Sequence, residues 1–144
     1  MQRQVCGVYV RPEAAYVVSS AWTVTGLLID REPVIRLERE APISVVGAAV
    51  LQALNATELD VPEPADRRSI TQPLLHAMGF TTWGAFTKGA LYLGMNYDGI
   101  AVEIIPSVAI GRGAFDYKGD KAARCPPEPV EVGQLVYQQL ALCS

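Results

Sequence analysis

The side chains that most often carry catalysis or bind metals are few in this sequence. His76 is the only histidine, so a Ser-His-Asp or Cys-His mechanism, or a metal site rich in histidine, would have to use it. It lies in a helix-like segment between leucine and alanine, which favours a structural or surface role. The Gly-x-Ser-x-Gly and Ser-x-x-Lys patterns of serine nucleophiles do not occur. We therefore expect no catalytic histidine or serine.

The three cysteines, Cys6, Cys125 and Cys143, are widely spaced and form no Cys-x-x-Cys pair, which is typical of free thiols in a reducing compartment. Cys6 lies in a strand-like run and Cys143 on an apolar helix face, so packing is the favoured role for both. The sequence therefore predicts no catalytic cysteine and no metal ligand.

Gly111-Arg112-Gly113 resembles the start of a dinucleotide-binding motif, but the third glycine and the following helix are missing. A glycine-rich turn is the favoured interpretation, and we expect no cofactor. Acids that could supply a pair for general acid-base catalysis are Asp98, Glu103, Asp116 and Asp120. The sequence places no two of them in one cleft, so solvated surface acids are the simpler interpretation.

Composition indicates one folded domain. The chain has 144 residues, of which 50% are hydrophobic and 19% charged, and it is predicted to form a single domain, residues 1–144. A net charge of −3 without a run of lysine or arginine argues against direct nucleic-acid binding. The first apolar stretch is too short for a signal peptide, and no run approaches the roughly 20 residues of a membrane span. We expect a cytoplasmic protein that contacts no membrane.

The first half of the chain reads as strands followed by helices. Runs rich in β-branched and aromatic residues predict three or four antiparallel strands at residues 4–10, 14–20, 24–29 and 34–38. Apolar residues at helical spacing then predict a helix near 44–55, with Ser44 as its N-cap. Residues 57–68 are predicted to be a loop, and the segment 69–80 a short helix with Pro73 near its first turn and Gly79 just after its end.

The clearest element is a β-hairpin near residues 91–105. Asp98-Gly99 separates two runs of alternating apolar residues, and this dipeptide favours a two-residue type I′ turn with Tyr97 opposite Ile100. The glycines and prolines of residues 107–129 predict irregular structure with at most one short strand. An amphipathic helix near 131–142 ends the chain. Together these elements predict an α+β fold in which helices pack on an antiparallel or mixed sheet.

Acidic residues are concentrated in the predicted loop. Residues 57–80 hold four acidic and two basic residues, a net charge of −2. The acids are Glu58, Asp60, Glu63 and Asp66. Two interpretations stay open: a solvated loop, or an acidic surface that contacts a basic partner.

Four segments of the second half resemble the CdiI-type immunity proteins of bacterial contact-dependent growth inhibition systems. They are Trp83-x-x-Phe86-x-Lys88, VEIIPS at 102–107, GRGAFDYKGD at 111–120 and the closing VGQLVYQQLALCS. The likeness covers residues 80–144, and the first half matches only in its order of strands and helix. None of these segments is catalytic.

The resemblance implies a non-enzymatic α/β or α+β domain that binds and neutralises a toxin domain, often a nuclease, delivered by a neighbouring cell. Immunity proteins vary at the surface that recognises the toxin, so no binding residue is carried over. From the charge distribution and the hairpin we expect the contact surface to contain Glu58, Asp60, Glu63, Asp66, Tyr97 and Asp98.

Two other functions remain open from the sequence. One is a small enzyme or ligand-binding domain that uses the loop from Gly111 to Asp120. The other is a homodimeric scaffold joined along the edge of the hairpin.

Overall fold

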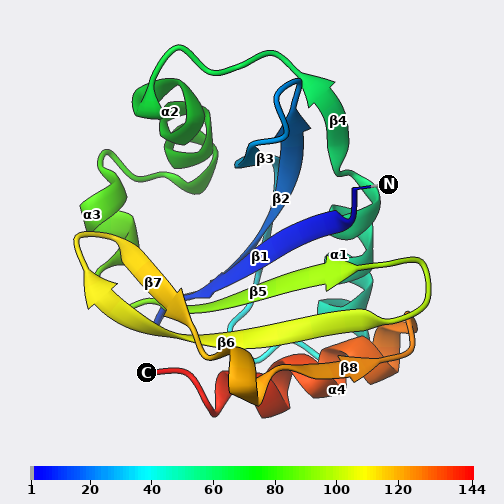
Figure 1. Cartoon of the computed structure of the whole chain (residues 1–144). Coiled ribbons are helices and arrows are strands. Elements are labelled where there is room, and N and C mark those ends of the chain that lie inside the picture. Colours follow the sequence, from blue (N-terminus) through cyan, green and yellow to red (C-terminus); the bar gives the residue numbers. More distant parts are fainter. Residues whose placement is uncertain (1) are drawn as a thin grey trace.

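The computed structural model describes residues 2–144 and shows an α+β fold built on one large sheet (Figure 1). Its elements are β1 (Gln4–Val10), β2 (Ala15–Thr23), β3 (Leu28–Leu37), α1 (Ile43–Asn55), β4 (Glu58–Val61), α2 (Arg67–Met78), α3 (Trp83–Thr87), β5 (Leu91–Tyr97), β6 (Val102–Gly111), β7 (Ala114–Tyr117), the 3₁₀ turn η1 (Gly119–Lys121), β8 (Ala123–Cys125) and α4 (Pro129–Leu140). The predicted fold class is confirmed.

The sheet has eight strands in the order β3-β2-β1-β5-β6-β7, with β4 beside β2 and β8 beside β6. Neighbouring strands are antiparallel except β2 and β4, which run parallel. In the hairpin, β5 lies between β1 and β6, and the outer side of β6 pairs with β7 and β8. Both sides of the hairpin are paired within the chain. The hairpin therefore has no free edge for the homodimer that the sequence left open.

The central hairpin is present as β5 and β6, but its register differs from the expected one. Tyr97 pairs with Val102 rather than Ile100, so the connection has four residues and not two. The carboxylate of Asp98 accepts hydrogen bonds from the backbone N–H groups of Ile100 (2.8 Å) and Ala101 (2.9 Å), and Asp98 lacks the positive φ of a type I′ turn. Since the pairing shifts by two residues, the same side chains still face the core.

Two other strand predictions are corrected in the first half. The separate strands expected at 24–29 and 34–38 form one strand, β3, which contains an irregularity where Glu32 and Pro33 have no partner on β2. The loop expected at 57–68 contains the short strand β4 and the start of α2.

The helix boundaries also differ in detail. α1 begins at Ile43 after Pro42, so Ser44 is inside the helix and is not its N-cap. α2 begins at Arg67, which places Pro73 in its interior rather than near the first turn, while Gly79 ends it in the left-handed conformation as predicted.

The segment 107–129, predicted to be mostly irregular, contains the end of β6 together with β7, η1 and β8. Glycines at both sides of the β6–β7 turn have positive φ, so they shape a tight connection instead of preventing strands. The C-terminal helix is confirmed as α4, two residues earlier than expected.

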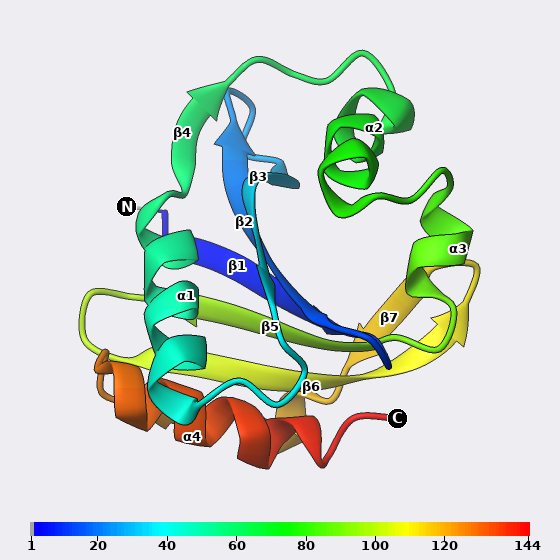
Figure 2. The ribbon, with the colours of Figure 1, turned by 180° about the vertical axis from the view of Figure 1, so that it is seen from behind.

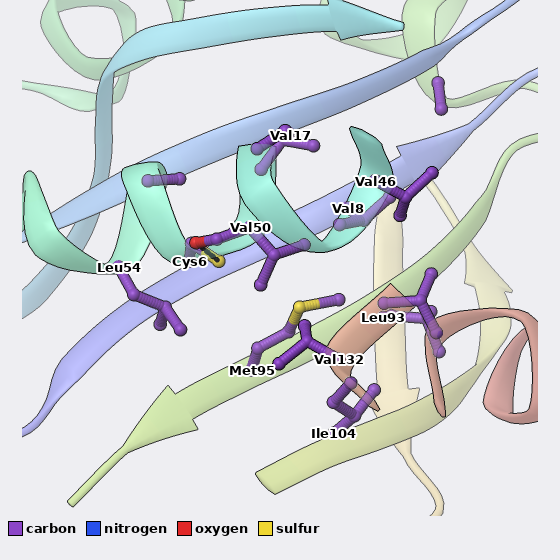
Figure 3. Close-up of a cluster of buried hydrophobic side chains, with 14 of the residues drawn as sticks. Cys6, Val8, Val17, Val46, Val50, Leu54, Leu93, Met95, Ile104 and Val132 are labelled. Carbon is purple, nitrogen blue, oxygen red and sulfur yellow. Dashed lines mark hydrogen bonds between the residues drawn. The ribbon is translucent and has the colours of Figure 1, made fainter. Parts of the chain in front are cut away.

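α1 and α4 cover one face of the sheet and enclose the larger core (Figure 2). Val50 of α1, Met95 of β5 and Val132 of α4 point toward one another in this core (Figure 3). All three side chains are at most 2% exposed. Burying such side chains contributes roughly 1.5–3 kcal/mol each, so this layer is the main source of stability.

Two glycines let α1 and α4 approach closely. A Cβ atom added at Gly47 would overlap the backbone of Pro129, and one added at Gly133 would overlap the backbone of Ile43. The contacts are reciprocal, because each glycine meets the first residue of the other helix. Any larger side chain would force the helices apart.

α2 and α3 lie on the opposite face of the sheet, over an aromatic cluster (Figure 2). The ring of Tyr9 meets the rings of Trp83 and Phe86 edge-on, with centroids 5.6 and 5.1 Å apart. The indole N–H of Trp83 donates to the carbonyl of Gly113 at 3.1 Å, which ties α3 to the β6–β7 turn. This face positions the cleft described below.

Candidate functional site

The six predicted contact residues lie in two segments near the end of the sheet where β1 begins. Glu58 and Asp60 are in β4, Glu63 and Asp66 follow it, and Tyr97 and Asp98 end β5. β1 connects the segments, because Gln4 pairs with Tyr97 and the backbone N–H of Val5 donates to the hydroxyl of Thr57, next to β4. In Figure 1, β4 and the β5–β6 connection both lie on the side of the N-terminus.

Three of the four loop acids have partners within the chain. Glu58 forms an exposed ion pair with Arg31 at 2.9 Å, a kind of contact that contributes about 0–1 kcal/mol. Glu63 accepts hydrogen bonds from the backbone N–H (2.9 Å) and the hydroxyl (2.6 Å) of Thr25, and these bonds lower the pKa of its carboxyl. It thereby fixes the β2–β3 turn.

Asp66 is the N-cap of α2. Its side chain accepts from the backbone N–H of Ser69 at 2.9 Å, and the hydroxyl of Ser69 pairs in return with the backbone of Asp66. This reciprocal pattern satisfies N–H groups that have no partner inside the helix. Asp66 therefore has a structural role that the sequence analysis missed, although an acid three residues before a serine was a readable signal.

Asp60 is the exception among the loop acids. It is exposed, its φ is 55°, and within residues 2–144 its carboxylate has no hydrogen-bond or ion-pair partner. Aspartate is one of the few residues that tolerates this left-handed conformation. Of the four loop acids, Asp60 alone presents an unengaged charge.

The end of the hairpin is shaped by Asp98. Besides its two backbone bonds, its carboxylate pairs with Arg124 at 2.7 Å. The backbone N–H groups and this guanidinium hold the pKa of the Asp98 carboxyl well below its usual range, so it stays charged. Tyr97 is half-buried against the larger core, and a shallow pocket of about 240 Å³ lies between it, Gln2 and Gly99.

The other reactive side chains do not form a site. His76 is exposed on α2, and Cys6 is buried in the core, where burial raises the pKa of its thiol. Among residues 2–144, no group of three or more His, Cys, Asp and Glu side chains is placed to hold a metal ion. No helix in that same range combines the length and the apolar character needed to cross a membrane.

Asp30 is the residue that the sequence analysis missed most clearly. Asp30 falls between the two strands expected at 24–29 and 34–38, yet it lies in β3, and its carboxylate accepts a hydrogen bond from the hydroxyl of Tyr9 at 3.1 Å. Burial raises the pKa of Asp30, and burial together with this carboxylate raises that of Tyr9. Asp30 lines two adjoining hollows of about 410 and 770 Å³, the second of which also includes Arg112 and Gly113.

Solved structures of other proteins share the fold of this chain. No family model and no curated protein sequence matches it. A protein of unknown function from Neisseria meningitidis has a TM-score of 0.83 and 19% identity, with 99% of this chain and 96% of that chain covered. A chain of the CdiA-CT/CdiI toxin and immunity complex from Yersinia pseudotuberculosis has a TM-score of 0.80 and 14% identity, with 100% and 99% covered. The chain thus shares its whole fold with a component of a toxin and immunity complex.

Proposed function

We propose that residues 1–144 form a single immunity-protein-like domain that binds a cognate toxin domain of a contact-dependent growth inhibition system and neutralises it in the cytoplasm. The observation that carries this proposal is the fold shared over the full length with a chain of the CdiA-CT/CdiI complex. That complex contains a toxin and an immunity protein. The resemblance of residues 80–144 to CdiI-type proteins and the acidic balance of the chain support the immunity role.

We place the contact surface on the six residues at the β1 end of the sheet. Asp60 supplies an unengaged carboxylate, and Glu58 and Glu63 are exposed acids that each have one partner residue within the chain. If the toxin is a nuclease, its substrate-binding surface is basic, and these carboxylates would meet it as phosphates do. Exposed charges of this kind act mainly through the association rate, and their effect falls as salt rises.

The test is a growth experiment with the protein encoded immediately upstream, taken as the candidate toxin. Co-production of this chain should restore growth, and Asp60→Asn should slow association with the toxin at low salt while leaving the folded protein unchanged. Asp120→Asn is the matched control, because it removes one exposed acid in η1, which is not part of the proposed surface. Failure to restore growth would contradict the immunity role. Equal association rates for both variants would contradict the proposed surface alone.

A second candidate function is ligand binding through the loop from Gly111 to Asp120. The specific observation in its favour is that Arg112 and Gly113 line the 770 Å³ hollow that Asp30 also borders. Binding of a small molecule by a chain that fails to restore growth in the presence of the toxin would favour this function over the immunity role.

A further inference from the structure

The larger hollow is a cleft on the face of the sheet that carries α2 and α3. It has a volume of about 770 Å³ and lies between α2, α3, the β2–β3 turn and the β6–β7 turn. Figure 2 shows these elements around one side of the sheet, with α2 near β3 and α3 near β7. Leu28, Ile70 and Trp83 form apolar walls. Sites for small molecules typically enclose about 300–1,000 Å³ and are mostly apolar with a few polar groups.

Three arginines line this cleft, and no acidic side chain of residues 2–144 forms an ion pair with them. Arg67 and Arg68 come from the first turn of α2, and Arg112 comes from the β6–β7 turn. All three are exposed, and within residues 2–144 none has an ion-pair or side-chain hydrogen-bond partner. Arg31 and Arg124, by contrast, each pair with an acid. The cleft is therefore locally cationic in a chain whose net charge is −3.

The local backbone differs between the arginines of α2 and Arg112. A cation in the first turn of a helix opposes the helix dipole, and at α2 the carboxylate of the N-cap Asp66 lies next to Arg67 and Arg68 in the chain. Arg112 has a φ of 56°, in the left-handed region that glycine, asparagine and aspartate occupy more easily. Arg112 is therefore held in an uncommon backbone conformation at the edge of the cleft.

A single carboxylate, that of Asp30, lines the same cleft. One of its oxygens, Oδ2, accepts the bond from Tyr9, while Oδ1 has no hydrogen-bond partner within residues 2–144. No buried side-chain oxygen or nitrogen in that range lacks a partner, so Oδ1 is reached by solvent through the cleft. The cleft thus combines three cationic donors, apolar walls and one acceptor.

We propose that this cleft binds a nucleotide with an amino-bearing base. Its phosphates would pair with Arg67, Arg68 and Arg112, since guanidinium groups match phosphate oxygens in charge and geometry. The base would lie against the apolar walls, and its amino group would donate to Asp30. The acidic side chain of a protein partner could also pair with the arginines, but it would leave the apolar walls and the acceptor unused. The site is independent of toxin binding.

The experiment uses the purified chain without any toxin and measures binding of ATP, UTP and pyrophosphate by calorimetry. Fluorescence of Trp83 in a Trp22→Phe background gives a second signal from the cleft itself. ATP should bind with a dissociation constant below 1 mM, and UTP, which lacks the amino group, and pyrophosphate, which lacks a base, should each bind at least about 10-fold more weakly.

The variant Arg67→Gln/Arg112→Gln should weaken ATP binding at least about 10-fold. The control Arg36→Gln/Lys121→Gln changes the net charge equally at exposed residues outside the cleft and should leave ATP binding within about 2-fold. Absence of ATP binding at millimolar concentration, equal loss in both variants, or equal binding of pyrophosphate and ATP would each overturn the proposal.

Discussion

Replacing Gly47 by alanine tests the close crossing of α1 and α4. The substitution should lower the stability of the folded chain if the helices are in close contact and raise it if they are not. Alanine is favoured over glycine in a helix interior by about 1 kcal/mol, so without a close neighbour the substitution would stabilise the chain. Here the added Cβ would lie 2.8 Å from the Cα of Pro129 and closer still to its carbonyl group. Ordinary contacts between carbon atoms are about 3.5–4 Å, so the helices must separate by more than roughly 1 Å.

The size of the effect follows from what the separation disturbs. Overpacking in a core costs about 1–3 kcal/mol, and a clash with rigid backbone belongs at the upper end of that range. Subtracting the helix preference leaves a net loss of about 2 kcal/mol. For a chain of this size, that corresponds to a fall of roughly 4–8 °C in the melting temperature.

Gly84→Ala is the matched control, because Gly84 also lies in a helix, α3, and an added Cβ would meet nothing within 4 Å. Thermal melts followed by circular dichroism should show a lower melting temperature for Gly47→Ala and an equal or higher one for Gly84→Ala. A Gly47→Ala variant as stable as the parent would refute the close packing of the two helices.

Three further predictions concern individual side chains. Asp66→Ala should cost about 1 kcal/mol because it removes the N-cap of α2, whereas Asp60→Asn should leave the midpoint of urea unfolding unchanged. The pKa of Asp98 is lower in the folded than in the unfolded chain, so its contribution to stability is present at neutral pH and is lost as the pH falls below about 4. The melting temperature of Asp98→Asn should therefore fall less than that of the parent between pH 5 and pH 2. An equal fall in melting temperature for the variant and the parent would contradict this. Cys6 is buried and its thiol pKa is raised, so a disulfide reagent should modify it only after denaturant is added; rapid reaction of all three cysteines in the native protein would count against the described core.

The sequence predicted the hairpin well because its evidence is local. Alternating apolar residues placed β5 and the start of β6, and a register error of two residues keeps the same face toward the core. The turn was wrong because the Asp98 side chain closes the connection in place of a backbone pair, and Arg124, distant in sequence, fixes that carboxylate. Apolar residues at helical spacing likewise predicted α1 and α4. The predicted N-cap, Ser44, was wrong because α1 begins one residue earlier, at Ile43.

The candidate surfaces could not be predicted because they depend on contacts between distant segments. Glu58 and Glu63 were predicted to belong to a contact surface, and Arg31 and Thr25 engage them from β3 and the β2–β3 turn. The cleft arises from segments that the sequence separates by up to 87 positions, and nothing in the neighbours of Asp30 indicates that it faces one. Strand β4 was missed because it has only four residues, two of them acidic, which is too short a pattern to indicate a strand.

The central claim is tight association with a toxin domain, and its most direct test is calorimetric titration of the purified chain with the candidate toxin domain. Immunity has to hold when few toxin molecules enter the cell, so the account predicts a 1:1 complex with a dissociation constant near 1 nM or lower, about −12 kcal/mol. Toxin activity should be abolished at the same 1:1 ratio. No heat of binding at micromolar concentrations, or full toxin activity in the presence of excess chain, would contradict the account.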